Sequence, residues 1–234
     1  KCTYGADLQY RGAAGNSYKL DYYEIKNPDG PNAYEDLARF ITVLNNTSSS
    51  DFECEIEQIF NVNSYLKCLV MDVLSGNWDG PNYNKNNFYL YFNTHSDQFE
   101  YIPYDLDNTL GVDFLGVEWS DRNIYNWSKS NANRPLFTKI MARETYRNRF
   151  NYFLNKALSE YFNPTLAYDR FNDIRLLIGD AAKADTIRML DYGYTWSDFN
   201  SSFGYFSKDH VKYGIQDFVT RRYNSAVSQL QTLE

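Results

Sequence analysis

The sequence predicts an α+β protein, a mostly helical body with one small β-hairpin in its middle. Two observations carry this prediction. On both sides of residues 88–104, apolar residues recur every three or four positions, the spacing of one helix face. Within 88–104, two short segments rich in aromatic residues flank the turn-forming stretch 93–97. Helices kept apart from a local antiparallel pair are typical of the α+β class.

Composition and charge exclude several function classes. The chain has 234 residues and a net charge of −7, and its lysines and arginines form no long run, so nucleic acid is not an expected partner. No apolar stretch approaches the length of a transmembrane helix. The three cysteines, Cys2, Cys54 and Cys68, form no C-x-x-C motif, so a zinc site is not expected. One disulfide is possible, and the spacing leaves its pairing open.

The N-terminal region is expected to be extended and rich in turns over residues 1–33. Tyr18, Leu20 and Tyr22 alternate as the residues of a strand do, and residues 27–31 form a turn cluster. Helical spacing then takes over and continues to the polar segment that precedes the hairpin.

The helices are expected on both sides of the hairpin. The clearest covers 62–75, with Gly76 directly after its end, where a left-handed residue commonly closes a helix. An irregular loop is expected over 111–133. Helical spacing also recurs over 37–44 and 52–60. From residue 134 onward the chain is expected to be mostly helical, with a long apolar face over 146–162 and further segments at about 165–178, 183–191 and 209–232.

Polar side chains flank the hairpin at both of its ends. Asp79, Asn84 and Asn87 precede the first strand, and Asp105 and Asp107 follow the second. Because antiparallel strands return to where they began, we expect these side chains to lie near one another. Carboxylate and amide oxygens suit a hard divalent cation, above all Mg²⁺.

The order of helix, Asp loop, hairpin and second Asp loop parallels the catalytic core of protein kinases. There, a loop Asp orients the substrate hydroxyl and an Asn holds metal. An Asp after a short hairpin holds the metal on the ATP phosphates. Asp79 and Asn84 even show the kinase D-x-x-x-x-N spacing. A plainer alternative stays open. Asp79 can belong to a turn, and Asp105 and Asp107 can cap the next segment.

Two other enzyme classes are weighed against this one. The only histidines are His95, in the hairpin turn, and His210, in a helical pattern, so a Ser-His-Asp or Cys-His mechanism is not expected. Residues 104–110 also resemble the D-x-D-x-T signature of haloacid-dehalogenase-type phosphatases. That reading requires a central parallel strand before Asp105, whereas the segment alternates and contains Pro103.

Three ordered motifs resemble those of the CotH family, the spore-coat protein H kinases. They are Gly76-Asn77-Trp78-Asp79, Asn87-Phe88-Tyr89-Leu90-Tyr91 and Ile102-Pro103-Tyr104-Asp105-Leu106-Asp107, against the family patterns G-N-x-D, N-[YF]-Y-L-Y and I-P-W-D-x-D. The resemblance extends over roughly 50–190, including Phe60-Asn61-Val62-Asn63-Ser64-Tyr65-Leu66, Arg134-Pro135-Leu136-Phe137 and Glu144-Thr145-Tyr146-Arg147. Tyr104 replaces the usual Trp and keeps a large aromatic ring beside Asp105.

The resemblance implies an atypical kinase, secreted or at the cell surface, that uses ATP with Mg²⁺ or Mn²⁺ to phosphorylate Ser or Thr of partner proteins. Asp79 matches the catalytic loop Asp. Asn87 and Asp105 match the nucleotide–metal residues, and Asp107 matches the second metal-binding Asp. The kinase-like spacing of Asn84 is then a coincidence, because the family Asn falls on Asn87.

The resemblance also implies that residues 1–234 form one kinase-like catalytic domain, a mostly helical lobe. The part of the family that covers the nucleotide and supplies a phosphate-binding Lys is not matched by any segment of this sequence. The segment alone is therefore expected to bind nucleotide weakly or to be inactive. The alternative function, from a different class, is a non-catalytic kinase-like module for binding or adhesion at the cell surface.

Overall fold

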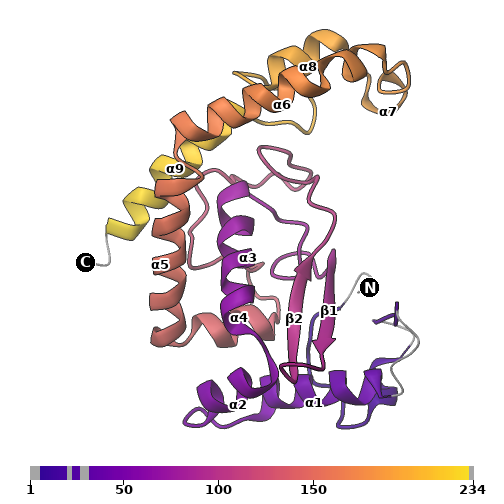
Figure 1. Cartoon of the computed structure of the whole chain (residues 1–234), viewed down its shortest axis with the longest axis vertical. Helices are drawn as coiled ribbons and strands as arrows, with labels where there is room; N and C mark the ends of the chain where they lie inside the picture. The colour runs from indigo at the N-terminus through magenta and orange to yellow at the C-terminus, as the bar shows by residue number, and fades with distance from the viewer. Residues whose placement is uncertain (1–5, 20–22, 27–31, 232–234) are drawn as a thin grey trace. The chain divides into compact units, whose positions relative to one another are not determined.

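The computed structural model describes residues 6–19, 23–26 and 32–231, and its contacts divide the chain into two compact units (Figure 1). Unit 1 consists of Lys1–Asp72, Trp78–Asp107 and Tyr125–Phe153; unit 2 consists of Val73–Asn77, Asn108–Ile124 and Leu154–Glu234. Helices dominate the described residues, and one two-stranded antiparallel sheet lies between them in the sequence. The predicted α+β class is confirmed. That residues 1–234 act as one catalytic domain stays a prediction.

Unit 1 is built around aromatic side chains from its helices and its hairpin. Phe40 packs against Phe60 and Phe99, with ring centroids 5.1 and 5.3 Å apart, and all three rings are buried. The helices predicted before the hairpin are confirmed. The helices of this unit are α1 (Ala33–Asn46), α2 (Phe52–Ile59), α3 (Val62–Ser75, whose last three residues belong to unit 2), α4 (Pro135–Met141) and the first part of α5 (Glu144–Glu160).

The hairpin has the predicted place and a regular register. Strand β1 (Phe88–Asn93) pairs antiparallel with β2 (Gln98–Pro103), from Phe88 opposite Pro103 to Asn93 opposite Gln98. Phe88, Phe99 and Tyr101 are buried on its inner face, because alternate residues of a strand point to the same side. The open end of the hairpin therefore places the residue before Phe88 beside the residue after Pro103.

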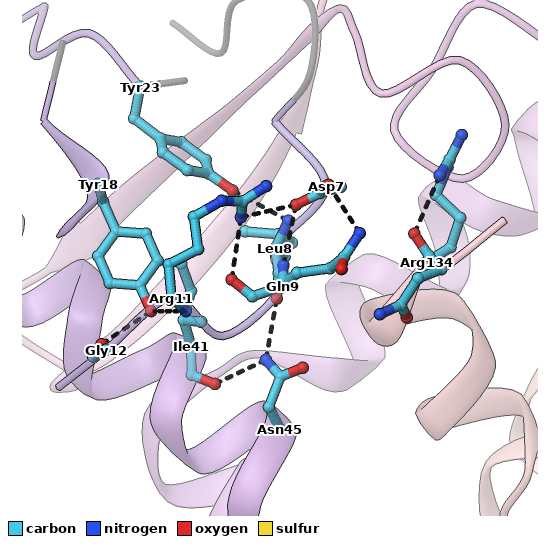
Figure 2. A network of polar contacts seen from close by, with 11 residues as sticks. Asp7, Leu8, Gln9, Arg11, Gly12, Tyr18, Tyr23, Ile41, Asn45 and Arg134 are labelled. Carbon is cyan, nitrogen blue, oxygen red and sulfur yellow. Dashed lines mark hydrogen bonds and ion pairs between the residues drawn. The ribbon is translucent and has the colours of Figure 1, made fainter. Parts of the chain in front are cut away.

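The N-terminal segment is held to α1 by side-chain hydrogen bonds (Figure 2). The Asn45 amide donates to the carbonyl oxygens of Leu8, at 2.9 Å, and Ile41, at 2.8 Å. The expected strand at Tyr18 is wrong at that residue. Tyr18 closes a short 3-10 helix, η1 (Gly15–Tyr18), because its buried hydroxyl donates to the carbonyl oxygen of Gly12. The remainder of that predicted strand, 20–22, and the predicted turn, 27–31, lie outside the described residues.

Unit 2 holds the C-terminal helices. Helix α6 packs against α9, where the Tyr168 hydroxyl donates to the carbonyl oxygen of Gln216 at 3.0 Å. The predicted division between 165–178 and 183–191 is wrong, because one uninterrupted helix runs to residue 184. The last helix begins at residue 215 rather than 209. The helices of this unit are the end of α5, α6 (Pro164–Ala184), α7 (Met189–Tyr192), α8 (Trp196–Ser202) and α9 (Ile215–Gln231).

Gly76 closes α3 in unit 2, as its position predicts. Its φ of 74° is left-handed, and a Cβ at this residue would lie 2.5 Å from Cζ of Phe218. Glycine is therefore required there for both conformation and space. The thiols of Cys54 and Cys68 are free, and Cys2 lies outside the described residues. Within the described part of the chain, no helix combines the length and apolarity needed to cross a membrane.

Candidate functional site

The loop after α3 surrounds the carboxylate of Asp79 with side-chain amides. The Asn87 amide nitrogen donates to Oδ2 of Asp79 at 3.0 Å, and the amides of Asn84 and Asn86 donate to Oδ1. Asp79 and Asn87 are both buried, so the bond between these two side chains is shielded from water. A buried carboxylate is retained only when its oxygens are satisfied, and here the amides of this one loop satisfy them and fix its orientation.

The backbone connects this loop to the acidic turn on the other side of the hairpin. The Tyr104 N–H donates to the carbonyl oxygen of Asn87 at 3.2 Å, one step beyond the Phe88–Pro103 pair. Asp105 follows immediately. Asn87 and Asp105 both have left-handed backbones, with φ of 53° and 55°. Such conformations are uncommon outside glycine and cluster at functional sites.

The two carboxylates of the turn are available to a ligand. Asp105 and Asp107 are exposed. Among the residues that the structure describes, neither accepts a hydrogen bond or pairs with a cation. The alternative that they cap the following segment is therefore not what these side chains do in this conformation.

The oxygen atoms at this end of the hairpin match the chemistry of a magnesium site in part. Because the Asn87 amide nitrogen is bound to Asp79, its Oδ1 stays an acceptor that can face a cation. The described residues contain no cluster of three His, Cys, Asp or Glu side chains able to hold a metal. Mg²⁺ in nucleotide sites needs no such cluster, since it takes one or two carboxylates and completes its shell with phosphate and water. The oxygen atoms of Asp105, Asp107 and Asn87 are of the types that such a metal takes.

The predicted residues come together to different degrees. Asp79 is hydrogen-bonded to both Asn84 and Asn87. Asn84 thus lies at the site, although the resemblance assigns the family Asn to Asn87. Asp105 is joined to them through the backbone of Tyr104. Asp107 lies two residues further on, and its side chain forms no hydrogen bond with the described residues of this group.

Two buried residues with polar groups that support the loop, Tyr65 and Arg134, could not be predicted from the sequence. The Tyr65 hydroxyl on α3 donates to Oδ1 of Asn82 at 2.7 Å, and Nε of Arg134 donates to the carbonyl oxygen of Tyr83 at 3.1 Å. Tyr65 lies in the apolar stripe of α3. The spacing of that stripe predicts that the ring is buried but does not predict a hydrogen bond by the hydroxyl. Arg134 is far away in sequence, and its motif gives no indication of a contact with residue 83.

Electrostatics keep the Tyr65 hydroxyl a hydrogen-bond donor. Burial raises the pKa of Tyr65 well above its usual value, and the negative charge of Asp72 raises it further. Burial and then Asp72 also raise the pKa of the Cys68 thiol on the same helix, to about 11. Both side chains are therefore neutral at physiological pH.

The fold and the site together define an α+β protein. Helix α3 leads to the loop that carries Asp79, the β1–β2 hairpin follows, and an acidic turn comes directly after β2. A sequence model of the family described as CotH kinase protein matches residues 1–227. The chain belongs to this family.

The curated relatives agree with this membership. The chain is 26% identical over 182 residues to the inner spore coat protein H of Bacillus subtilis, an alignment that covers 75% of this chain and 47% of that protein. It is 26% identical over 188 residues to the invasin CotH3 of Rhizopus delemar, covering 71% of this chain and 31% of that protein. The invasin CotH7 of the same fungus is 25% identical over 167 residues, covering 66% of this chain and 27% of that protein. The chain thus matches less than half the length of each of these relatives.

Proposed function

We propose that this chain is the catalytic body of a protein kinase that transfers the γ-phosphate of ATP to Ser or Thr hydroxyls of secreted or surface proteins. One observation carries the proposal. A buried Asp held by amides is joined, through the Tyr104–Asn87 backbone hydrogen bond, to a turn with two exposed and unpartnered carboxylates. Membership in a family described as a kinase supports the same activity.

Each side chain has a separate role in this proposal. Asp79 orients the acceptor hydroxyl, since the amides of Asn84, Asn86 and Asn87 already fix its carboxylate. Asp105, Asp107 and Oδ1 of Asn87 would hold Mg²⁺ or Mn²⁺ on the ATP phosphates. The cation, when bound, neutralises charge on the transferring phosphoryl group. Phosphoryl transfer asks the protein mainly for positioning, which a rigid loop and a short hairpin provide.

The localisation proposed for the protein follows its relatives. One is named an inner spore coat protein and two are named invasins, so a coat or a cell surface is where we expect this chain to act. Its substrate would then be a protein of the same coat or surface.

The phosphatase alternative has no support in the described structure. Strand β2, which precedes Asp105, pairs antiparallel with β1, whereas that class needs a central parallel strand. The sequence Gly179-Asp180 also imitates a later metal-binding motif of that class, but it lies inside helix α6. The non-catalytic binding module is the competing proposal, and a kinase assay separates the two.

The decisive experiment measures phosphate transfer by the full-length protein with labelled ATP and either Mg²⁺ or Mn²⁺. Asp105→Asn removes one charge and keeps the shape of the side chain. Asp97→Asn is its matched control, because Asp97 is also exposed, has a φ of 60°, and lies in the turn at the opposite end of the same hairpin. We expect metal-dependent phosphoserine or phosphothreonine from wild type and Asp97→Asn, and a loss of about 100-fold or more in Asp105→Asn.

A thermal-shift titration with ATP and metal shows whether a variant loses activity because it no longer binds these ligands. A ligand that binds only the folded state raises the melting temperature by mass action. We expect a metal-dependent shift in wild type that Asp105→Asn lacks. If the Asp105→Asn variant is active, Asp105 is not part of the site. If the wild type is inactive and its melting temperature does not shift, the binding module is favoured.

A further inference from the structure

One tyrosine on α3 contacts both arms of the candidate site. The Tyr65 hydroxyl donates to Oδ1 of Asn82, three residues after Asp79. The Tyr65 ring lies edge-on to Tyr101 with centroids 5.6 Å apart, and Tyr101 is in β2, four residues before Asp105. Tyr65 is completely buried, so neither contact is replaced by water.

The contact with the Asp79 arm is reinforced from the same helix. The Asn82 amide nitrogen also approaches Oδ2 of Asp72, at 3.4 Å. Tyr65 and Asp72 are seven residues apart on α3, two turns on one face, so one helix face holds both ends of the Asn82 amide. Asn82 and Asp72 are both buried. A buried polar chain in which each group has a partner defines one geometry, because any other arrangement leaves an unsatisfied polar atom.

The contact with the Asp105 arm is made by packing. Tyr101 stacks on Phe88 across the two strands, with centroids 5.9 Å apart, and Phe88 directly follows Asn87. The edge-on Tyr65 ring therefore sets the position of the strand pair whose end carries Asn87 and Asp105. Aromatic pairs in this range are favourable beyond the area that they bury.

We propose that Tyr65 is a positioning residue of the site, whose hydroxyl and ring together fix the Asp79 loop relative to the turn that carries Asp105. This inference rests on the proposed kinase function for its effect on catalysis, although the geometry itself does not. Tyr65 touches no reacting atom and acts through Asn82 and Tyr101. Displacing a catalytic group by about 1 Å is enough to lower a rate by up to roughly 100-fold.

The test uses Tyr65→Phe in the full-length protein, because this change keeps the ring and removes only the hydroxyl. Tyr146→Phe is the matched control. Tyr146 is equally buried, and its hydroxyl donates to a backbone carbonyl, that of Glu53 at 3.3 Å, far from the loop in sequence. Both variants lose one hydrogen bond of a buried tyrosine, so we expect similar losses of thermal stability.

The readouts separate positioning from stability. We expect kcat to fall roughly tenfold in Tyr65→Phe with the KM for ATP changed by less than about twofold, and neither to change in Tyr146→Phe. Hydrogen exchange of the peptide covering 79–87 supplies a readout without catalysis. This peptide includes the Asn84 N–H, which donates to the Gly80 carbonyl oxygen at 2.9 Å. We expect its exchange to be at least about fivefold faster in Tyr65→Phe only.

The outcomes distinguish this inference from the proposed function. If Tyr65→Phe matches Tyr146→Phe in both kcat and exchange, the positioning role is wrong. If the wild-type protein transfers no phosphate, the kinase proposal fails, and the exchange measurement decides alone. Faster exchange of 79–87 in Tyr65→Phe then still supports Tyr65 as the residue that holds the loop, and unchanged exchange overturns it.

Discussion

The amide nitrogen of Asn87 lies 3.0 Å from Oδ2 of Asp79, and this buried bond joins Asp79 to the residue directly before β1. We predict that Asn87→Asp replaces the donor by a second carboxylate and destabilises the protein by about 2–4 kcal/mol at pH 7. Urea unfolding at pH 7 measures this.

Asn86→Asp is the control for that experiment. The Asn86 amide is 3.4 Å from Asp79 and the residue is only half-buried, so its replacement should cost clearly less than that of Asn87. Equal losses from the two variants would contradict a special role for the Asn87 bond.

The left-handed backbone of Asp105 makes a prediction that is independent of catalysis. Asn adopts this conformation about as readily as Asp, whereas a β-branched residue does not. We predict that Asp105→Asn changes the free energy of unfolding by less than about 0.5 kcal/mol and that Asp105→Val lowers it by about 1–2 kcal/mol. Under the proposed kinase function both variants should be inactive, so stability and activity separate. Equal stability of the two variants would show that the φ of 55° does not constrain this position.

The site was predictable where the chain itself brings residues together. A hairpin returns to its start, so the proximity of Asn87 to the Asp105 turn follows from the pattern of two strands and a short loop. The contacts of Tyr65 with Asn82 and of Arg134 with Tyr83 were not predictable, because they join segments whose relative placement depends on packing. No glycine-containing turn motif includes Asn87 or Asp105, so the left-handed backbone of these two residues was not predictable either.

Two errors in the helical part have different physical causes. Residues 179–183 contain glycine and no large apolar side chain, so the apolar periodicity stops there, yet α6 continues through them. The omission of α8 was avoidable. Thr195 and Asp198 form a capping box in which each side chain bonds the backbone N–H of the other, and the T-x-x-D spacing that produces it is visible in the sequence.

The two described cysteines are predicted to differ in reactivity. Burial, with the charge of Asp72, raises the pKa of Cys68 to about 11, so at pH 8 its thiolate is roughly 100-fold scarcer than for a thiol at the ordinary 9.0. Cys54 is exposed. We expect iodoacetamide to label Cys54 first, with Cys68 following only in denaturant or as the pH approaches 11. Peptide mapping by mass spectrometry measures both, and comparable labelling in the folded protein would contradict the prediction.

Glu118 in unit 2 predicts how stability depends on acid. Burial alone would raise its pKa, but hydrogen bonds from Ser120, Tyr213 and Lys212 outweigh it and hold the pKa at about 2, below the ordinary 4.5. Ionised Glu118 therefore stabilises the folded state fully above pH 4.5, and this stabilisation is lost as the pH falls through about 2. Because the side chain is 41% exposed, we expect it to amount to only about 1 kcal/mol.

Replacing Glu118 by Gln tests this directly. We expect Glu118→Gln to lower the free energy of unfolding by about 1 kcal/mol at pH 7 and to flatten its fall between pH 4.5 and 2. Glu160→Gln is the control, since Glu160 is exposed and its contact with Lys156 is long, at 3.9 Å. Chemical denaturation at each pH supplies the curves. A Glu118→Gln curve that falls as steeply in acid as that of wild type would show that other carboxylates dominate the acid transition.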